Sequence, residues 1–403
     1  MKTADQLLVK QINKILVLNT IYRERTISRA EISKLTGLNK STVSALVDEL
    51  LSEGLVLEIG IGESQGGRKP INLAINSEFG SVIGIDLGVN YVLSILTNFA
   101  GDIIWEKRVA TNNVMNSQEQ NVDHLFTLIR ETMQHAPLTR CGIIGIGVGA
   151  PGMVNYDQGY ILSAPNLLWE NIKLKDIIED EFNIPTLVDN EANAGAIGEK
   201  WFGFGKKISE LVYVSAGTGI GAGIVINNEL YRGARGLAGE IGHMTVDVHG
   251  IKCTCGNIGC WEEYASEKAL LRYLKENAAK HLDSLLLAEG SLNPDSLTIF
   301  KIAEAAKKGD SLAIAGLKNI GYYLGVGIAN LINVFDPKCV VVGNVLPLAG
   351  DIFMDELRKE VERRSFSFKY SNVKIVPSEL SMKACALGAV ALVISRIYAS
   401  PVA

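Results

Sequence analysis

Three cysteines lie close together in the segment Cys253-Thr-Cys255-Gly-Asn-Ile-Gly-Cys260. A histidine that could complete a set of four ligands precedes the segment, at position 243 or at position 249. Three thiolates and one imidazole are typical of a closed, tetrahedral zinc site of the structural kind. The spacing therefore predicts a structural Zn²⁺ site whose fourth ligand is His243 or His249, and the alternative is a loop with unrelated thiols.

A second group of residues that could bind a ligand or take part in a reaction is the segment Asp189-Asn-Glu-Ala-Asn193. It follows the apolar run Ile-Pro-Thr-Leu-Val, which is typical of a buried strand, and it precedes a helix-like stretch. Ligands of α/β proteins bind at the carboxyl ends of strands, and a carboxylate between two amides suits the hydroxyls of a polyol. Glu191 could hold such a ligand or act on it as a base, and this segment leaves both roles open.

Two stretches, 81–109 and 211–233, share the pattern of a strand, a glycine-rich turn and a returning strand. The turns read Asp86-Leu-Gly-Val-Asn90 and Gly217-Thr-Gly-Ile-Gly221. Glycine-rich turns after strands allow backbone amides to approach a phosphate, although ordinary hairpins also use glycine for its conformational freedom. The repetition of the pattern predicts two related lobes around a cleft.

The first part of the chain has the pattern of a winged helix-turn-helix. Ser28 and Glu31 form a capping box that starts a short helix, and Asn39 can cap a second helix. In the second helix an apolar stripe recurs at helical spacing. Its members are Val43, Leu46, Val47 and Leu50. Two strand-like runs, at 55–60 and 71–76, flank a loop that contains Arg68 and Lys69.

The polar residues of this head indicate a nucleic-acid partner. The second helix begins with small polar side chains and one lysine, which is typical of a helix whose N-terminal end enters a DNA major groove. The basic loop can lie along a minor groove. A head that binds only protein, with an ordinary loop, is the alternative. We predict binding to double-stranded DNA through Arg29, Lys40, Ser41, Thr42, Ser44, Arg68 and Lys69.

Length and composition set further bounds. A chain of 403 residues is expected to form two or three domains. The net charge is −5, while the first 75 residues have a small basic excess, which favours an anionic partner for the head. The N-terminus lacks the apolar core of a signal peptide, and the stretch 384–395 is shorter than the ~20 residues that span a bilayer. The expected location is the cytoplasm, without membrane contact.

Taken together, the two glycine turns, the 189–193 segment, Glu240-Ile-Gly-His243 and the cysteine segment resemble the ROK family of sugar kinases and repressors. The resemblance extends over essentially the whole chain, because some members have a winged-helix head, and several segments are most similar to the xylose repressors of this family. It implies an α/β protein with an actin-like (ribonuclease H-like) body of two lobes. The expected domains are 1–76 for the head, 77–200 with 381–403 for the first lobe, and 201–380 for the second.

The resemblance also implies where ligands bind. It favours His243 over His249 as the metal ligand beside Cys253, Cys255 and Cys260, and it places a sugar between the lobes. Carboxylates can accept hydrogen bonds from vicinal hydroxyls, while amides and imidazole both donate and accept. The implied sugar contacts are Asn166, Asn190, Glu191, Glu240, His243 and Glu262.

Three departures from the family's kinases imply that this chain does not transfer phosphate. The kinases have an aspartate at position 191, where it acts as the base, and their first turn reads Asp-x-Gly-Gly-Thr. Here that turn contains Val89 and Asn90, and Asn344 stands in a third turn where two glycines are typical. D-Xylose in its ring form also lacks the hydroxymethyl group that accepts phosphate. No catalytic residue is expected, and Glu191 is expected to hold the sugar.

The resulting expectation is a sugar-responsive transcriptional repressor, with D-xylose as its effector. It would bind a palindromic operator as a dimer or larger homo-oligomer and leave it when sugar binds. An ATP-dependent hexose kinase with an added DNA-binding head is one alternative, which the unchanged turn Gly217–Gly221 favours. A repressor controlled by a phosphorylated sugar or by a partner protein is the other, although the acidic pocket disfavours a bound phosphate.

Overall fold

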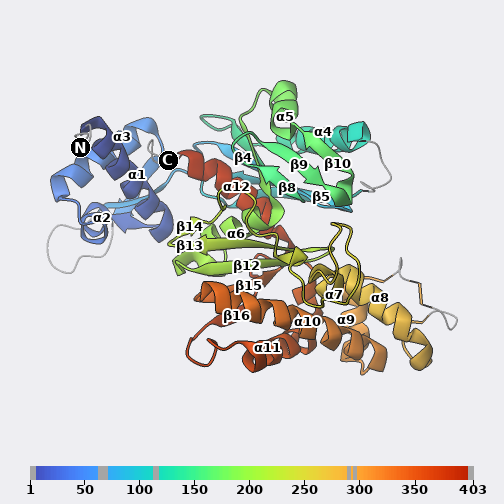
Figure 1. The fold of residues 1–403 in the computed structure, drawn as a ribbon. Helices are drawn as coiled ribbons and strands as arrows, with labels where there is room; N and C mark the ends of the chain where they lie inside the picture. The colour runs from blue at the N-terminus through green and yellow to red at the C-terminus, as the bar shows by residue number, and fades with distance from the viewer. Residues whose placement is uncertain (1–5, 62–70, 112–117, 288–291, 294–296, 398–403) are drawn as a thin grey trace.

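The computed structural model describes residues 6–61, 71–111, 118–287, 292–293 and 297–397 (Figure 1). These residues form an N-terminal head and a body of two lobes, each lobe with its own sheet. The predicted winged helix-turn-helix followed by a two-lobed α/β body is confirmed. The wing loop, including Arg68 and Lys69, lies outside the described residues.

Three helices and a small antiparallel sheet, in the order β1-β3-β2, form the head. The elements are α1 (Gln6–Glu24), β1 (Ile27–Ser28), α2 (Arg29–Thr36), α3 (Lys40–Glu53), β2 (Val56–Ile61) and β3 (Ile71–Ile75). Ser28 and Glu31 form the predicted capping box, and the side chain of Asn39 accepts a hydrogen bond from the amide of Thr42. The predicted apolar stripe of α3 is buried in the core of the head.

Each lobe of the body is built on a five-stranded sheet, and the two sheets have the same plan. In both, a three-stranded antiparallel meander is extended by two strands that run parallel to its first strand. The first sheet has the order β11-β7-β4-β5-β6 and the second the order β14-β13-β12-β15-β16. This duplication confirms the prediction of two related lobes.

The first lobe contains β4 (Ser81–Leu87), β5 (Tyr91–Asn98), β6 (Ile103–Ala110), α4 (Gln118–Gln134), β7 (Ile143–Ala150), β8 (Met153–Asn155), β9 (Tyr160–Ala164), the 3-10 helix η1 (Pro165–Leu167), β10 (Trp169–Ile172), α5 (Leu174–Phe182) and β11 (Thr186–Asn190). The second contains η2 (Phe204–Lys207), β12 (Leu211–Ala216), β13 (Ile220–Ile226), β14 (Glu229–Leu230), η3 (Ile241–His243), α7 (Glu262–Ala265), α8 (Glu267–Asn277), η4 (Ala278–Lys280), α9 (Ile299–Lys307), α10 (Ser311–Phe335), β15 (Cys339–Gly343), η6 (Leu346–Ala349), α11 (Asp351–Arg364) and β16 (Lys374–Pro377).

Two helices rich in small residues, α6 (Glu191–Trp201) and α12 (Ala384–Ile397), lie between the sheets (Figure 1). Helix α12 packs on β4 and β7 of the first lobe, and α6 packs mainly on β12 and β13 of the second. They cross so closely that a Cβ added at Gly388 would overlap the carbonyl oxygen of Ala194. The expected boundary at residue 200 therefore falls at the end of a helix that both lobes share.

Helix α10 is the one described helix that is long and apolar enough, by length and composition, to cross a membrane. It packs against α8 and α11, and most of its apolar stretch is buried inside the second lobe. The indole of Trp261 donates a hydrogen bond to the carbonyl oxygen of Tyr323 on this helix, at 2.7 Å. These contacts are typical of the core helix of a folded lobe.

The head packs directly on the body, and its core is continuous with that of the first lobe through Phe99 and the end of α12. The ring of Tyr22 on α1 lies 4.9 Å from the ring of Trp201, the last residue of α6. Arg140 of the first lobe donates to the carbonyl oxygen of Glu53, the last residue of α3, at 2.8 Å. Helix α1 and the predicted recognition helix α3 are thus both attached to the body.

Candidate functional site

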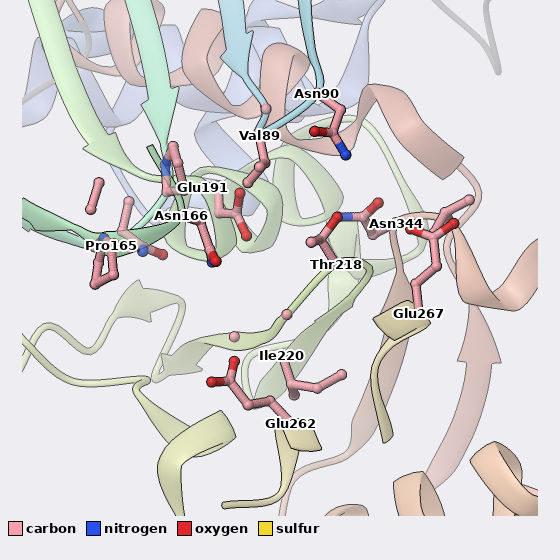
Figure 2. Close-up of a pocket in the computed structure, with 18 of the residues that line it drawn as sticks. Val89, Asn90, Pro165, Asn166, Glu191, Thr218, Ile220, Glu262, Glu267 and Asn344 are labelled. Atoms are coloured by element: carbon pink, nitrogen blue, oxygen red, sulfur yellow. Dashed lines mark hydrogen bonds between the residues drawn. The ribbon is translucent and has the colours of Figure 1, made fainter. Parts of the chain in front are cut away.

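A cavity of about 320 Å³ lies between the two lobes. It is lined by all six residues that were expected to contact a sugar, namely Asn166, Asn190, Glu191, Glu240, His243 and Glu262. Figure 2 shows Asn166 and Glu191 on one side of the cavity and Glu262 on the other, with Val89 and Asn90 at one end. Residues that are far apart in the sequence therefore converge on one space.

The first lobe contributes two amides. The Oδ1 atom of Asn190 accepts hydrogen bonds from the amides of Ala192 and Asn193 and so caps α6, while its Nδ2 donates to the carbonyl oxygen of Gly152 at 2.8 Å. Because a side-chain amide has two N–H groups, one donor of Asn190 remains for a ligand. Asn166 accepts a hydrogen bond from Lys268 of the second lobe at 3.0 Å.

Glu191 begins α6 at the boundary between the cavity and the interior. Burial, together with the nearby carboxyl groups of Asp86 and Glu240, raises its pKa to about 8. The side chain is therefore a neutral carboxylic acid at pH 7, which can donate a hydrogen bond but cannot take a proton. This state suits a residue that holds a hydroxyl group.

The second lobe contributes the acidic side chains and the imidazole. Glu240 and His243 lie at η3, and Glu262 begins α7. Burial raises the pKa of Glu240, whereas His243 lowers it and Glu262 raises it. Oε1 of Glu262 lies 3.5 Å from Nδ1 of His243. The pocket thus combines several acceptors with few fixed cations, a composition that suits a polyhydroxyl ligand better than a phosphate.

The histidine and the three predicted cysteines form one cluster beside the cavity. The Nδ1 atom of His243 and the Sγ atoms of Cys253, Cys255 and Cys260 all lie within 4.8 Å of one another. Cys255 and Cys260 are 3.6 Å apart, and Cys253 is 3.7 Å from His243 Nδ1. Ligands about 2.3 Å from a tetrahedral ion are separated by about 3.8 Å, so the cluster fits a metal ion. Among the described residues His243, rather than His249, completes the set.

An ion pair between a buried aspartate and a half-buried arginine joins the lobes next to Asn190, and the sequence patterns did not point to it. Asp189 is 1% exposed and accepts two hydrogen bonds from Arg232, at 2.9 and 2.7 Å. The guanidinium carbon of Arg232 lies 3.8 Å from the ring centroid of Tyr156. The position of Asp189 beside Asn190 and Glu191 was at most a weak indication of an ion pair here, because its partner Arg232 is distant in the sequence.

The residues that were expected to contact DNA occupy different environments in the head. Lys40 and Ser41 are exposed at the start of α3, and Thr42 and Ser44 are half-buried there. Arg29 forms ion pairs with Asp48 at 2.8 Å and Glu58 at 3.3 Å. The described part of the head therefore presents the first turn of α3 to solvent, whereas Arg29 holds its neighbouring elements together.

Comparisons with known proteins agree with this architecture. Residues 82–396 match the ROK family, and residues 11–59 match the MarR family. The chain is 48% identical over 394 residues to a putative xylose repressor of Caldicellulosiruptor sp. (strain Rt8B.4), with 98% of each chain covered.

Two solved structures share the fold. One is a ROK family transcriptional regulator described as a homologue of the Escherichia coli MLC protein, with a TM-score of 0.81, 29% identity and 97% of each chain covered. The other is a ROK family glucokinase from Streptomyces griseus in complex with glucose and AMPPNP, with a TM-score of 0.71 and 33% identity, covering 78% of this chain and 99% of the kinase. From its sequence, its two-lobed body and its winged head, the chain belongs to the ROK family.

Proposed function

We propose that this protein is a cytoplasmic transcriptional repressor that binds a palindromic operator as a homodimer and leaves it when D-xylose binds between the lobes. The observation that carries the proposal is the cavity between the lobes, where the six residues expected to contact a sugar converge. The helix-turn-helix head packs on this same body through a shared apolar core. The similarity to a putative xylose repressor over nearly the whole chain supports the choice of effector.

The proposed mechanism uses the attachment of the head to the body. Because α1 and α3 contact the first lobe and the end of α6, a change in the angle between the lobes would turn the head relative to the second lobe. In a dimer this motion would change the spacing of the two recognition helices. Sugar shifts the equilibrium only through its different affinity for the two arrangements, and a hundredfold loss of operator affinity requires about 2.7 kcal/mol.

The cysteine and histidine cluster is proposed to hold one structural Zn²⁺. Three thiolates and one imidazole leave no open position for a substrate, so the ion would supply structure and no reaction chemistry. By fixing His243 through Nδ1, it would set the tautomer and orientation of the imidazole that lines the cavity. The metal and the sugar would then share one residue.

The test is release of DNA by sugar. The full-length protein first selects its operator from a pool of random duplexes, and binding to that duplex is then titrated with D-xylose, D-glucose or ATP with Mg²⁺. Release by D-xylose at concentrations that saturate the protein supports the proposal. Phosphorylation of a hexose at ordinary kinase rates would instead favour the kinase alternative, and no response to any free sugar would favour control by a phosphorylated sugar or a partner protein.

A first prediction concerns the protonation of Glu191. Its pKa of about 8 in the folded state exceeds that of an unfolded glutamate, so stability falls as pH rises between about 5 and 8. The Glu191→Gln variant lacks this titration, and its melting temperature should exceed that of the wild type by a margin that grows over this range. Thermal unfolding at four pH values measures the effect. The exposed Glu276→Gln serves as control, and a margin that shrinks with pH would contradict the assignment.

A second prediction concerns the recognition helix. Lys40 is exposed in the first turn of α3, where it can contact a phosphate of the operator. Lys40→Ala should weaken operator binding and reduce the slope of log K against log salt by about 0.9 for each protomer of a dimer. Fluorescence anisotropy at several salt concentrations measures this slope. Lys275→Ala, on the exposed face of α8, should leave the slope unchanged.

A further inference from the structure

An arginine of the second lobe, Arg232, belongs to the loop that leads from β14 to Glu240. The amide of Ala238 donates to the carbonyl oxygen of Arg232 at 3.1 Å, which closes the loop on itself. The amide of Ala222, on β13, donates to the carbonyl oxygen of Gly239 at 3.0 Å and so fixes the end of the loop to the sheet. The position of Arg232 is therefore tied to that of Glu240.

The side chain of Arg232 reaches partners in the first lobe. Its guanidinium group donates two hydrogen bonds to Asp189, at 2.9 and 2.7 Å, and its central carbon lies 3.8 Å from the centroid of the Tyr156 ring. A planar guanidinium can pair with both oxygens of a carboxylate while it stacks on an aromatic face, whereas the ammonium group of lysine cannot. Because Asp189 is only 1% exposed, loss of the arginine would leave a buried carboxylate without its ionic partner.

Asp189 in turn holds residues of the first lobe that line the cavity. Its Oδ1 atom accepts a hydrogen bond from the backbone amide of Asn190 at 2.8 Å and another from Nδ2 of Asn193 at 3.3 Å. Asn190 and Glu191 line the cavity, whereas among the described residues neither Asp189 nor Arg232 is part of its lining. Arg232 can thus affect a bound ligand only through other residues.

The carboxyl groups on the two sides of the cavity work against this connection. Glu191 belongs to the segment that follows Asp189, while Glu240 ends the loop of Arg232, and the charge of Glu240 is one of the causes that raise the pKa of Glu191. Like charges on opposite lobes oppose a close approach of the lobes. The pair of Arg232 with Asp189 joins opposite charges at the same boundary, so it favours the approach that the carboxyl groups oppose.

We infer that Arg232 is a positioning residue for the sugar site, which fastens the loop that ends at Glu240 to the segment Asp189–Glu191 of the other lobe and so sets the distance between the two halves of the site. The inference rests on the proposed function, because it concerns the same site and identifies what holds its halves together. A sugar that contacts both halves favours the same arrangement of the lobes as the ion pair, so each strengthens the other.

The experiment measures the affinity for D-xylose, and for D-glucose as a second probe, by isothermal titration calorimetry on the full-length protein without DNA. Arg232→Ala should weaken sugar binding by about tenfold or more. Arg232→Lys keeps the charge but not the paired hydrogen bonds, so it should weaken binding by a smaller factor. Arg235→Ala is the matched control, because Arg235 is exposed in the same loop, and it should leave the affinity unchanged.

A double-mutant cycle with Asp189→Asn separates positioning from a general loss of stability. If Arg232 acts through Asp189, Arg232→Ala should change sugar affinity by less than about threefold in the Asp189→Asn protein. A cooperative thermal transition shows that each variant is folded, and Arg232→Lys takes the place of Arg232→Ala if the latter lacks one. Unchanged affinity in the folded single variant, or an equal loss in both backgrounds, would overturn the inference.

Hydrogen–deuterium exchange provides a measurement that needs no ligand. In the free protein, peptides that cover residues 189–193 and 231–240 should exchange faster in Arg232→Ala than in the wild type or in Arg235→Ala, because both segments lose their connection. Unchanged exchange in either segment would contradict the inference. Failure of both sugars to bind the wild type would instead contradict the proposed function, and the exchange result would still decide the role of Arg232.

Discussion

Replacement of Cys255 by alanine is expected to prevent binding of the proposed Zn²⁺ and to weaken the response to sugar. The Sγ atom of Cys255 is one of the four possible ligand atoms of the cluster, which also includes Nδ1 of His243. His243 lines the sugar cavity together with Glu262. Without the ion the imidazole loses its fixed orientation, and sugar affinity should fall by about tenfold or more. Loss of about 2–3 kcal/mol of metal-linked stability should lower the melting temperature of the body by roughly 3–4 °C.

The measurements are metal content by mass spectrometry, sugar affinity by calorimetry and operator binding by anisotropy. Operator affinity without sugar should change little, because α3 and its contacts with Arg140 lie in the head and the first lobe. Cys141→Ala is the matched control, since Cys141 is an exposed cysteine outside the cluster. Unchanged sugar affinity in a Cys255→Ala protein that contains no metal would contradict the link through His243.

Replacement of Trp201 by alanine is expected to separate sugar binding from DNA release. Helix α6 extends from Glu191 in the cavity to Trp201, whose ring packs against Tyr22 of the head. The variant should bind sugar with normal affinity but should lose most of the coupling, so that the sugar-dependent change in operator affinity falls from about a hundredfold to less than about threefold. Trp201→Phe retains an aromatic ring and should preserve much of the response.

Reciprocity gives this prediction a second measurement. If sugar weakens operator binding by a given factor, the operator must weaken sugar binding by the same factor, and both factors should approach one in Trp201→Ala. Trp105→Ala is the control, because Trp105 is also half-buried but stacks on His135, 4.7 Å away in the first lobe. A full response in Trp201→Ala would show that the signal passes through other contacts, such as that of Arg140 with Glu53.

The sequence was informative wherever a structure depends on neighbours in the chain. The capping box of Ser28 and Glu31 and the apolar stripe of α3 follow from spacing alone, because these contacts span no more than a few helical turns. The strand, turn and strand patterns likewise predicted the meanders of both lobes. The three cysteines indicated a metal site for the same reason, although the choice of His243 over His249 required the resemblance to the ROK family.

The tertiary structure decided the contacts between the lobes and between the head and the body, because these contacts depend on how α6 and α12 pack. The pairing of Asp189 with Arg232 crosses between the lobes, and that of Tyr22 with Trp201 joins the head to the body. The hydrogen bond of Tyr91 to Asp86 lies within one hairpin, whereas Asn344 reaches a small cavity beside them from the other sheet.

The sequence by itself therefore determined the two kinds of domain through short-range patterns, while the family and the residues expected in the cavity followed from the resemblance of its motifs to the ROK family. The tertiary structure determined which of those residues are free to bind. Asn190 is largely engaged in capping α6, Arg29 is paired with carboxylates, and the surroundings of Glu191 raise its pKa to about 8. The physical reason is that burial, protonation and hydrogen-bond occupancy depend on atoms brought from distant parts of the chain, which no local pattern contains.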